Sequence, residues 1–425
     1  MKKKAIFWFR NDLRLGDNLA LQKAIQKAEQ ILFVYAIPPD AVSNFSFYKW
    51  KFLEESVLDL SEQLKEKGAT LYFLHDWDLS RWIALCQAEE IEAVYASAGV
   101  GYYEQQEEQK LMEALQTKGI SCHFYFQHTL IAPEDLGFSI EQLPNVFTDF
   151  RKKVEANCRV VAPISAPQQI RGLSTTLPTQ WPAATTFGIQ DFPIDSRTAF
   201  PFSGGERAAH QRLQFYLWES NLIADYKNTR NGLIGADYSS KLSPWLAWGC
   251  ISARSVYAAV KRFESERIQN ESTYWLVFEL LWRDYFQWVM CKYGKRLFSL
   301  YGIKGKATRE WSRSEALLAD WVHGRTPEPL VNANMLELKH TGFMSNRGRQ
   351  WVASYLIHDL GIDWRLGASY FEKMLIDYDV ASNWGNWAYL AGVGNDPRPN
   401  RYFSPASQGE RYDPEGNHQR LWLKR

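Results

Sequence analysis

The sequence predicts two domains of different fold class: an N-terminal α/β domain with a parallel sheet and a C-terminal all-helical domain, joined by a long connector. In the first 130 residues, apolar runs typical of strands alternate with segments of helical periodicity, which indicates βαβ units. Residues 131–203 lose that alternation and are rich in proline, serine and threonine. From residue 204 helical spacing returns, and 13 of the 18 tryptophans lie there. We therefore expect domains over 1–130 and 204–425, with 131–203 as the connector.

Five apolar runs in the first domain are predicted strands. They are mostly continuous rather than alternating, as expected for strands buried on both faces of a parallel sheet. The runs are residues 5–9, 31–37, 71–75, 93–97 and 121–126. Helices are expected from an N-cap at Asp17 to about Gln30, over 47–67, from Leu79, and over 103–118, with another at 147–157 in the connector. The domain has neither G-x-G-x-x-G nor a Walker loop, so the common phosphate cradle is absent.

Composition limits the classes of protein that this chain fits. No apolar run approaches the roughly 20 residues that span a bilayer. The apolar run after the basic start stops at Arg10, which is too short for a secretory signal. The five cysteines are scattered, and no metal site is expected. These features predict free thiols in a reducing cytoplasm. We also expect a monomer, and import into an organelle stays open.

The stretch from Asp377 to Tyr389 (D-Y-D-V-A-S-N-W-G-N-W-A-Y) combines carboxylates, amides, indoles and phenols within one short segment. Buried polar groups without partners are costly, and surface loops seldom carry so many large aromatics. The mixture fits a pocket wall for a flat, polar-edged aromatic ligand. The alternative is a tryptophan-rich turn whose polar groups are satisfied locally.

Residues 238–249 (Y-S-S-K-L-S-P-W-L-A-W-G) resemble an anion site at a helix start. Serine hydroxyls, Lys241 and the N–H groups of a first helical turn bind phosphate oxygens well. The alternative is an ordinary N-cap at Ser243 followed by Pro244.

On a helix over 274–288, Glu279, Trp282, Arg283 and Phe286 share one face at spacings of three and four. This face combines a carboxylate, a guanidinium and large flat rings. The alternative is a buried helix in which Arg283 serves only as the salt-bridge partner of Glu279.

Basic residues gather in the second half of the chain. Residues 1–205 are acidic overall and 206–425 are mildly basic, so a polyanion would dock on the rear half. Asn346, Arg347 and Arg349 stand beside a glycine-containing turn, a combination that suits a phosphate backbone. Ordinary solvated surface is the alternative for these residues.

Together, seven collinear motifs resemble the photolyase/cryptochrome family of flavoproteins, and within it the DASH-type cryptochromes. The motifs are F-W-F-R-N-D-L-R-L-G-D-N (7–18), D-Y-S-S-K-L-S-P-W-L-A (237–247), E-L-L-W-R-D-Y-F (279–286), T-G-F-M-S-N-R-G-R-Q (341–350), D-L-G-I-D-W-R-L-G-A (359–368), D-Y-D-V-A-S-N-W-G-N-W (377–387) and A-G-V-G-N-D-P-R-P-N-R-Y-F (391–403). The resemblance spans nearly the whole chain. It implies an N-terminal Rossmann-like α/β domain and a C-terminal helical domain that holds a folded FAD.

The resemblance also implies roles for individual residues. Arg349 would pair with Asp377, and Asn383 would face the reactive ring nitrogen of the flavin with a neutral amide. The implied FAD contacts are Tyr226, Ser239, Ser240, Lys241, Leu242, Ser243, Arg283, Arg349, Asp377, Asp379 and Asn383. The implied tryptophan chain that passes an electron to the flavin is Trp387, Trp364 and Trp311.

In the family, light drives an electron from reduced flavin to a cyclobutane pyrimidine dimer, which then splits. Glu279 resembles the carboxyl group that hydrogen-bonds the dimer, Trp282 and Tyr389 resemble its two aromatic walls, and Asn346 and Arg347 would contact DNA. Flipping a base out of a duplex costs a few kcal/mol, and stacking returns about 1–3 kcal/mol per base. Because a tyrosine wall returns less than a tryptophan wall, the resemblance predicts repair preferentially in single-stranded DNA.

An antenna pigment, methenyltetrahydrofolate, is implied near Gln106 and Glu107, although these residues also fit a plain surface helix. The chain departs from the family pattern at Pro327, Asn332 and Trp351, and it ends soon after L-W-L. Replacing the usual aspartate with Asn332 is expected to weaken a cap or an ion pair.

Three hypotheses follow. The first is a DASH-type photolyase, and the second is a blue-light receptor that binds DNA without repairing it. The third is an electron-transfer flavoprotein that uses its α/β half for a nucleotide.

Overall fold

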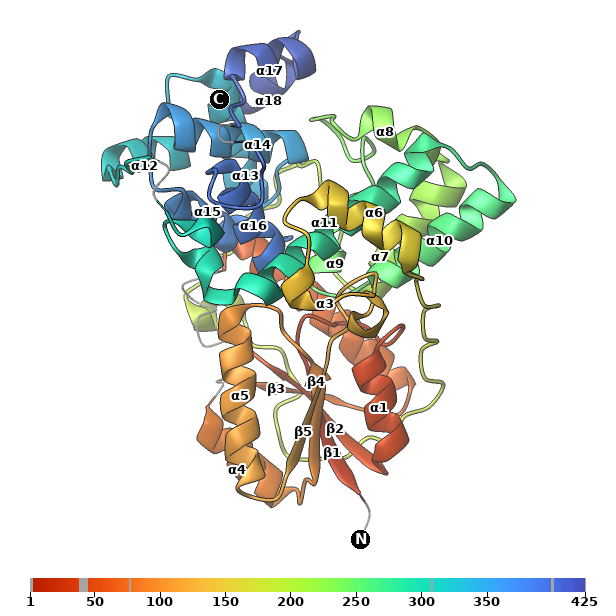
Figure 1. The fold of residues 1–425 in the computed structure, drawn as a ribbon. Helices are drawn as coiled ribbons and strands as arrows, with labels where there is room; N and C mark the ends of the chain where they lie inside the picture. Colours follow the sequence, from red (N-terminus) through yellow and green to blue (C-terminus); the bar gives the residue numbers. More distant parts are fainter. Residues whose placement is uncertain (1–2, 38–44, 76–77, 307–308, 399–400, 425) are drawn as a thin grey trace.

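The computed structural model describes residues 3–37, 45–75, 78–306, 309–398 and 401–424. A parallel sheet flanked by helices forms the lower half of the molecule, and a larger, mainly helical region lies above it (Figure 1). This is the fold class that the sequence predicted. No helix in the described part of the chain is long and apolar enough to cross a membrane.

The sheet has five parallel strands in the order β3-β2-β1-β4-β5, and each predicted apolar run forms one of them. The strands are β1 (Lys4–Phe9), β2 (Gln30–Ala36), β3 (Leu71–Leu74), β4 (Ala93–Ser97) and β5 (Ser121–Tyr125). The helices around them are α1 (Leu19–Lys27), α3 (Phe47–Glu66), α4 (Leu79–Ala88) and α5 (Tyr102–Gln116). Alternate residues of β1 divide between two cores: Phe7 and Phe9 pack with α1 and α3, and Ile6 and Trp8 pack with α4 and α5.

The first helix begins differently from the prediction. Its N-cap is Asn18, whose Oδ1 accepts a hydrogen bond from Leu21 N at 3.1 Å, and Gln30 already belongs to β2. Asp17 has φ 50°, and its carboxylate accepts two hydrogen bonds from the guanidinium of Arg254 at 2.9 and 3.0 Å. Local sequence predicted that the Asp17 carboxylate caps the helix, but in the structure this carboxylate pairs with Arg254 from a distant segment.

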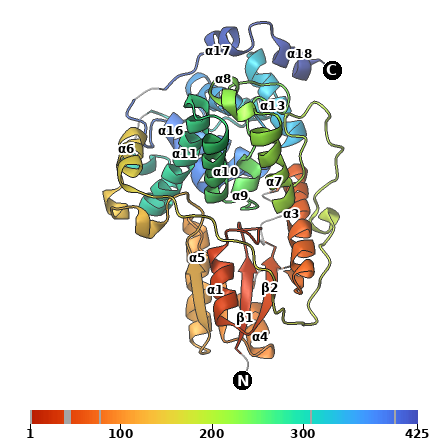
Figure 2. The same ribbon diagram turned by 90° about the vertical axis from the view of Figure 1, so that its right-hand side faces the viewer.

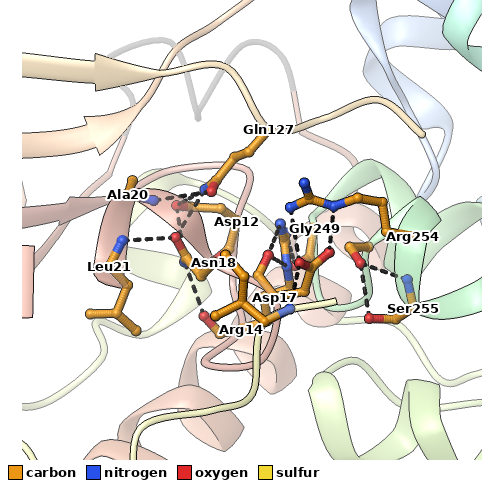
Figure 3. Close-up of polar contacts among 12 residues, drawn as sticks. Asp12, Arg14, Asp17, Asn18, Ala20, Leu21, Gln127, Gly249, Arg254 and Ser255 are labelled. Atoms are coloured by element: carbon orange, nitrogen blue, oxygen red, sulfur yellow. Dashed lines mark hydrogen bonds and ion pairs between the residues drawn. The ribbon is translucent and has the colours of Figure 1, made fainter. Parts of the chain in front are cut away.

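The segment that follows β1 joins the α/β half to the helical half through buried polar contacts (Figure 3). Arg14 Nη1 donates to Gly249 O of the helical half at 2.8 Å. Within the α/β half, Asp12 Oδ2 accepts a hydrogen bond from Gln127 Nε2 at 3.2 Å, which holds this segment in place. Gly249 has φ 67°, and a Cβ there would lie 2.0 Å from Asn11 O, so this close approach requires glycine.

The connector crosses the surface of the α/β half, as Figure 2 shows on the right of that view. It contains the predicted helix α6 (Phe147–Asn157). Ile31 N donates to Arg171 O at 3.0 Å, and Phe73 N donates to Pro178 O at 2.8 Å, so the connector is tied to β2 and β3.

The helical half is arranged around α11 (Glu271–Tyr293), a helix of 23 residues that contacts α8, α10 and α16. The other helices are α7 (Glu206–Gln214), α8 (Tyr226–Thr229), α9 (Ser243–Ala247), α10 (Ala253–Glu266), α12 (Glu315–Val322), α13 (Pro329–Thr341), α14 (Asn346–Ser354), α15 (Trp364–Met374), α16 (Val380–Leu390), α17 (Pro405–Tyr412) and α18 (Asn417–Leu423). A cavity lies among them.

Candidate functional site

A cavity of about 660 Å³ lies between α9, α11, α14 and α16. Most of the predicted binding residues line it. They are Tyr226, Ser239, Ser240, Lys241, Leu242, Ser243, Glu279, Trp282, Arg283, Asn346, Arg349, Asp377, Asp379 and Tyr389. These residues come from five separate parts of the sequence, so the fold gathers into one site what the motifs only placed in order.

Lys241 is a buried cation without a hydrogen-bond partner. Its side chain is 3 % exposed, its Nζ lies 3.3 Å from the ring centroid of Tyr238, and no acceptor reaches that Nζ within the described residues. Burial lowers the pKa of the Lys241 ammonium well below its usual range. The buried hydroxyl of Tyr238 also lacks a partner. An anion in the cavity would satisfy both groups.

Arg212, which sequence reasoning missed, holds the Lys241 loop in place. Its guanidinium donates to Ser239 O at 3.0 Å and to Ser240 O at 3.1 Å, and it pairs with Asp237 at 2.8 Å. These contacts support the left-handed backbone of Lys241, whose φ is 61°. No local pattern identified Arg212, because its partners lie more than 20 residues away.

Asp377 pairs with Arg349, as the resemblance implied. Arg349 Nη2 lies 2.9 Å from Asp377 Oδ2, and Ser243 Oγ donates to the same oxygen at 2.6 Å. Ser243 is therefore the first residue of α9 and a partner of Asp377, not the plain N-cap of the alternative reading. Asp377 Oδ1 is buried and has no hydrogen-bond partner among the residues that the structure describes, which leaves an acceptor beside the cavity.

Asp379 caps helix α16 and links it to α11. Its Oδ1 accepts from Ser382 N at 2.7 Å, and its Oδ2 accepts from Gln287 Nε2 at 2.7 Å. This fixes the position of the Asp377–Asp379 segment along the cavity wall.

The predicted face of α11 is confirmed, since Glu279, Trp282, Arg283 and Phe286 all line the cavity. The alternative, in which Arg283 is the salt-bridge partner of Glu279, is not what the structure shows. Glu279 Oε1 accepts from Arg230 Nη1 at 2.5 Å. Arg283 instead donates to backbone oxygens, including Leu246 O at 3.2 Å. Burial raises the pKa of Glu279, and the positive charge of Arg230 opposes that shift.

Part of the cavity wall is aromatic. The rings of Trp282 and Tyr389 stand 6.1 Å apart at 84°. Arg401 Nη2 donates to Tyr389 Oη at 2.7 Å, which fixes the phenol. Phe147 from the connector stacks on Trp282 at 3.7 Å and 12°. Sequence reasoning missed Phe147, because the connector gave no sign that it reaches the helical half.

Several predicted residues lie outside the cavity lining. Asn383 is buried on α16, where its Nδ2 donates to Ala368 O at 3.0 Å. Arg347 Nε donates to Asn231 Oδ1 at 2.8 Å. Gln106 and Glu107 are exposed on α5. The roles that the resemblance gave these residues stay predictions.

The three tryptophans of the implied electron chain have different surroundings. Trp387 packs against Gly367, where a Cβ would lie 2.3 Å from its ring. Trp364 is fully buried, and its Nε1 donates to Leu300 O at 3.2 Å. Trp311 is only partly buried. Their role as a chain also stays a prediction.

The departures from the family pattern form local contacts. Asn332 Oδ1 accepts from Thr326 N at 2.9 Å, and Asn332 Nδ2 donates to Thr326 O at 2.7 Å, so the amide closes the turn before α13. The expected weakening at this position is not seen in these contacts. Trp351 is fully buried and donates to Gln408 Oε1 at 3.0 Å, which ties α14 to α17.

Comparison with known proteins agrees with this geometry. Residues 5–168 match the family model described as DNA photolyase, and residues 275–425 match the model described as the FAD binding domain of DNA photolyase. The chain is 44% identical to a cryptochrome DASH of Natronomonas pharaonis over 99% of this chain and 90% of that protein. It is 46% identical to a cryptochrome DASH of Xenopus laevis over 97% of this chain and 81% of the relative. A crystal structure of a Synechocystis cryptochrome superposes with a TM-score of 0.95 at 43% identity, covering 99% of this chain and 88% of that one.

No group of three or more histidine, cysteine, aspartate or glutamate side chains suited to a metal ion occurs among the described residues. The unpartnered atoms of the cavity instead fit a nucleotide cofactor. Lys241 Nζ matches a phosphate, and Asp377 Oδ1 matches a ring N–H or a ribose hydroxyl.

Proposed function

The chain belongs to the cryptochrome DASH group of the photolyase and cryptochrome family, with FAD as its cofactor, and from that premise we propose that it is a blue-light-driven lyase. Its proposed reaction is the repair of cyclobutane pyrimidine dimers, preferentially in single-stranded DNA. When bound, the FAD supplies the light absorption and the one-electron chemistry of this reaction.

The residues of the polar end would hold the cofactor. Lys241, Ser240 and Ser243 offer a cation and hydroxyls for the pyrophosphate beside the start of α9. Asp377 offers its unpartnered oxygen to the ring system or the ribose, and the ion pair with Arg349 orients that carboxylate. These residues bind and orient the cofactor and exclude water from it.

The position of Glu279 is the observation that carries the proposal of repair. This carboxyl group lies one helical turn from Trp282 in the cavity wall, which Tyr389 also lines, and Arg230 holds it in place. A receptor or a simple electron carrier has no need for an acid at an aromatic cavity mouth. A carboxyl group there can hydrogen-bond the carbonyl and N–H edge of a pyrimidine that lies between the two rings.

The preference for single strands rests on the size of the second aromatic wall. A duplex substrate must first lose the stacking and pairing of two bases, which costs a few kcal/mol. Stacking on aromatic side chains returns about 1–3 kcal/mol per base, and Tyr389 offers less surface than an indole. Lesions that are already unpaired therefore enter more easily.

A second candidate, a blue-light receptor that binds DNA without repairing it, is favoured by one contact. Phe147 stacks on Trp282 and occupies the place where a base would stack. Repair requires Phe147 to swing aside, whereas a receptor could keep the contact. The cavity that gathers the predicted binding residues lies in the helical half. The α/β half has a pocket of about 520 Å³ beside α5 and β5, but its lining, among the described residues, has no lysine or arginine for the phosphates of a nucleotide, which disfavours the third hypothesis.

The test uses FAD-loaded, reduced protein and an ultraviolet-irradiated thymine oligomer under blue light. Wild-type protein is expected to restore undamaged thymine faster on the single strand than on the same sequence in a duplex. Glu279→Gln, which removes the acid at nearly constant volume, should lower that rate at least about tenfold, the effect of losing one well-placed charged hydrogen bond.

Phe147→Ala distinguishes the two candidates, because it removes the ring that competes for Trp282. It should speed repair if Phe147 only gates the site. Light absorption without repair by both wild-type protein and Phe147→Ala would establish the receptor instead.

The antenna and the location of the protein are also part of the proposal. Methenyltetrahydrofolate would bind near Gln106 and Glu107 on the exposed side of α5. Loss of a near-ultraviolet folate band in Glu107→Ala, with the flavin band retained, would support this. The free cysteines agree with a reducing compartment such as the cytoplasm.

A further inference from the structure

Trp384 contacts the implied electron chain, although the sequence motifs gave it no role. It lies on α16 one helical turn before Trp387. Its ring centroid is 5.8 Å from that of Trp364 at 75°, an edge-to-face contact between two buried indoles. Helices α15 and α16 lie side by side in Figure 1 and are in direct contact. An electron can therefore pass between Trp384 and Trp364 without an intervening group.

The indole of Trp384 has a carboxylate as its hydrogen-bond acceptor. Its Nε1 donates to Glu372 Oε2 at 3.1 Å. Loss of one electron makes an indole N–H a much stronger acid, so an adjacent carboxylate both stabilises the positive charge and can take the proton. The phenol of Tyr378 lies near the same carboxylate.

Trp311, the implied end of the chain, has the opposite electrostatic environment. The guanidinium of Arg309 lies 5.3 Å from its ring centroid, and Arg309 is held there by Ile357 O at 2.8 Å and by His358 Nδ1 at 3.1 Å. A guanidinium keeps its charge under all ordinary conditions, so it disfavours a positive charge on the ring below it. Within the described residues, Trp311 Nε1 is buried with no acceptor for its proton.

We propose that Trp384, not Trp311, is the terminal electron donor on which the radical is formed, with Glu372 as the acceptor of its proton. This inference rests on the light-driven electron transfer of the proposed function. It is carried by the contrast between the two indoles: one is hydrogen-bonded to a carboxylate and touches Trp364, and the other lies under a guanidinium without a proton acceptor.

The steps balance in electrons and protons. When bound, FAD would supply the light-generated one-electron oxidant, and loss of one electron from the tryptophan chain to that oxidant would leave Trp364 as a radical cation. Trp384 then gives one electron to Trp364, and the proton of Trp384 Nε1 moves to Glu372. The product is a neutral Trp384 radical beside a protonated carboxyl group. A one-electron donor from solution, such as a thiol, later reduces the radical, and the proton returns from Glu372.

The surroundings of Trp384 favour a long-lived radical. Its side chain is 8 % exposed, and it packs against Phe298 at 4.8 Å. Glu372 lies at the junction of the two halves, where its backbone oxygen accepts a hydrogen bond from Lys49 Nζ at 2.8 Å. External donors therefore reach this indole slowly, and charge separation lasts longer than at an exposed terminal tryptophan.

Flash photolysis with transient electron paramagnetic resonance on FAD-loaded protein tests the inference. Wild-type protein should give a neutral tryptophan radical, distinguished from the radical cation by its visible absorption. Glu372→Gln keeps a hydrogen-bond acceptor but removes the base, so the long-lived species should change to the radical cation. In Trp384→Phe the yield of the long-lived radical should fall several-fold, whereas in Trp311→Phe the neutral radical should persist.

Three outcomes separate the possible failures. Loss of the radical in Trp311→Phe together with its survival in Trp384→Phe would overturn the inference. If Trp384→Phe does not fold, an unchanged radical spectrum in Glu372→Gln would overturn it equally. Trp387→Phe should abolish the radical in either arrangement. A loaded wild-type protein that yields no tryptophan radical would instead overturn the proposed photochemistry, and this inference with it.

Discussion

Two buried polar clusters of this protein differ in one respect, the completeness of their hydrogen bonding. At the junction of the two halves, Asp17 receives two hydrogen bonds from Arg254, and Asp12 is bonded by Gln127 (Figure 3). In the cavity, Lys241 Nζ and Asp377 Oδ1 are also buried, but neither atom has a hydrogen-bond partner among the described residues. A folded protein tolerates few such atoms, because each costs free energy.

This difference in hydrogen bonding distinguishes the cluster that stabilises the fold from the cluster that binds the cofactor. The junction cluster is complete within the chain, so its residues stabilise the contact between the α/β and helical halves. The cavity cluster is incomplete within the described residues and is completed by the cofactor. Buried charged residues should therefore stabilise the cofactor-free protein at the junction and destabilise it in the cavity. The free energy of unfolding of variants measures both effects.

The largest expected effect is at the junction. Arg254→Met should lower the free energy of unfolding by about 3–5 kcal/mol, because it leaves the fully buried carboxylate of Asp17 without its ion-pair partner and with the hydrogen bond from Ile164 N. Denaturant titration measures this change. Arg262→Met is the matched control: Arg262 pairs with Glu266 on the exposed side of the same helix, and its loss should cost under about 0.5 kcal/mol. Equal effects of the two variants would refute the distinction.

An intermediate case is Lys49, a buried lysine that bonds a backbone oxygen and, within the described part of the chain, no carboxylate. Burial lowers the pKa of Lys49 from 10.5 to about 7. Between those pH values the unfolded chain binds the extra proton, so this group raises the free energy of unfolding as pH rises, by up to about 1.4 kcal/mol per pH unit.

The measurement is unfolding of wild-type protein and Lys49→Met across that pH range. The variant should lose this slope, and below about pH 7, where both states of the wild-type protein carry the charge, the difference in unfolding free energy between the two proteins should stop changing with pH. Lys65→Met, an exposed lysine on the same helix, is the control. A wild-type slope in Lys49→Met would show that the lysine is not the titrating group.

Lys241→Met should have the opposite sign to Arg254→Met. It removes an unpartnered buried cation, so the cofactor-free protein should gain about 1–3 kcal/mol in its free energy of unfolding. Thermal or denaturant unfolding of flavin-free protein measures the gain. A clear loss of stability would mean that Lys241 already has a partner in the empty protein.

The smallest expected effect is at the C-terminal helices. Gln408→Leu removes the acceptor of the Trp351 indole and should cost about 0.5–1.5 kcal/mol, the ordinary value of one hydrogen bond. In a Trp351→Phe background the same substitution should cost almost nothing, because the donor is already gone. Additive losses in the double variant would show that the two residues act independently.

Sequence reasoning found what local patterns determine. The five strands and the cavity-facing side of α11 follow from periodicity, and the pairing of Arg349 with Asp377 follows from the family resemblance. It missed contacts between distant segments: Arg230 with Glu279 and Phe147 with Trp282. The N-cap of the first helix was predicted wrongly for the same reason. Asp17 suits a cap by local sequence, but its carboxylate accepts a hydrogen bond from the guanidinium of Arg254 on α10.

The resemblance also passed over Trp384, because a motif records which residues recur and not the electrostatics around them. The carboxylate of Glu372 and the guanidinium of Arg309 became neighbours of their indoles only through the fold.

The most direct test of the account is a titration of flavin-free protein with FAD, followed by calorimetry and by the visible absorption of the flavin. We expect one FAD per chain, with affinity reduced at least about tenfold in Lys241→Met and in Asp377→Asn, since each removes a charged partner of the cofactor. Binding of FAD by both variants with wild-type affinity would contradict the claim that these two buried, unpartnered groups are completed by the cofactor.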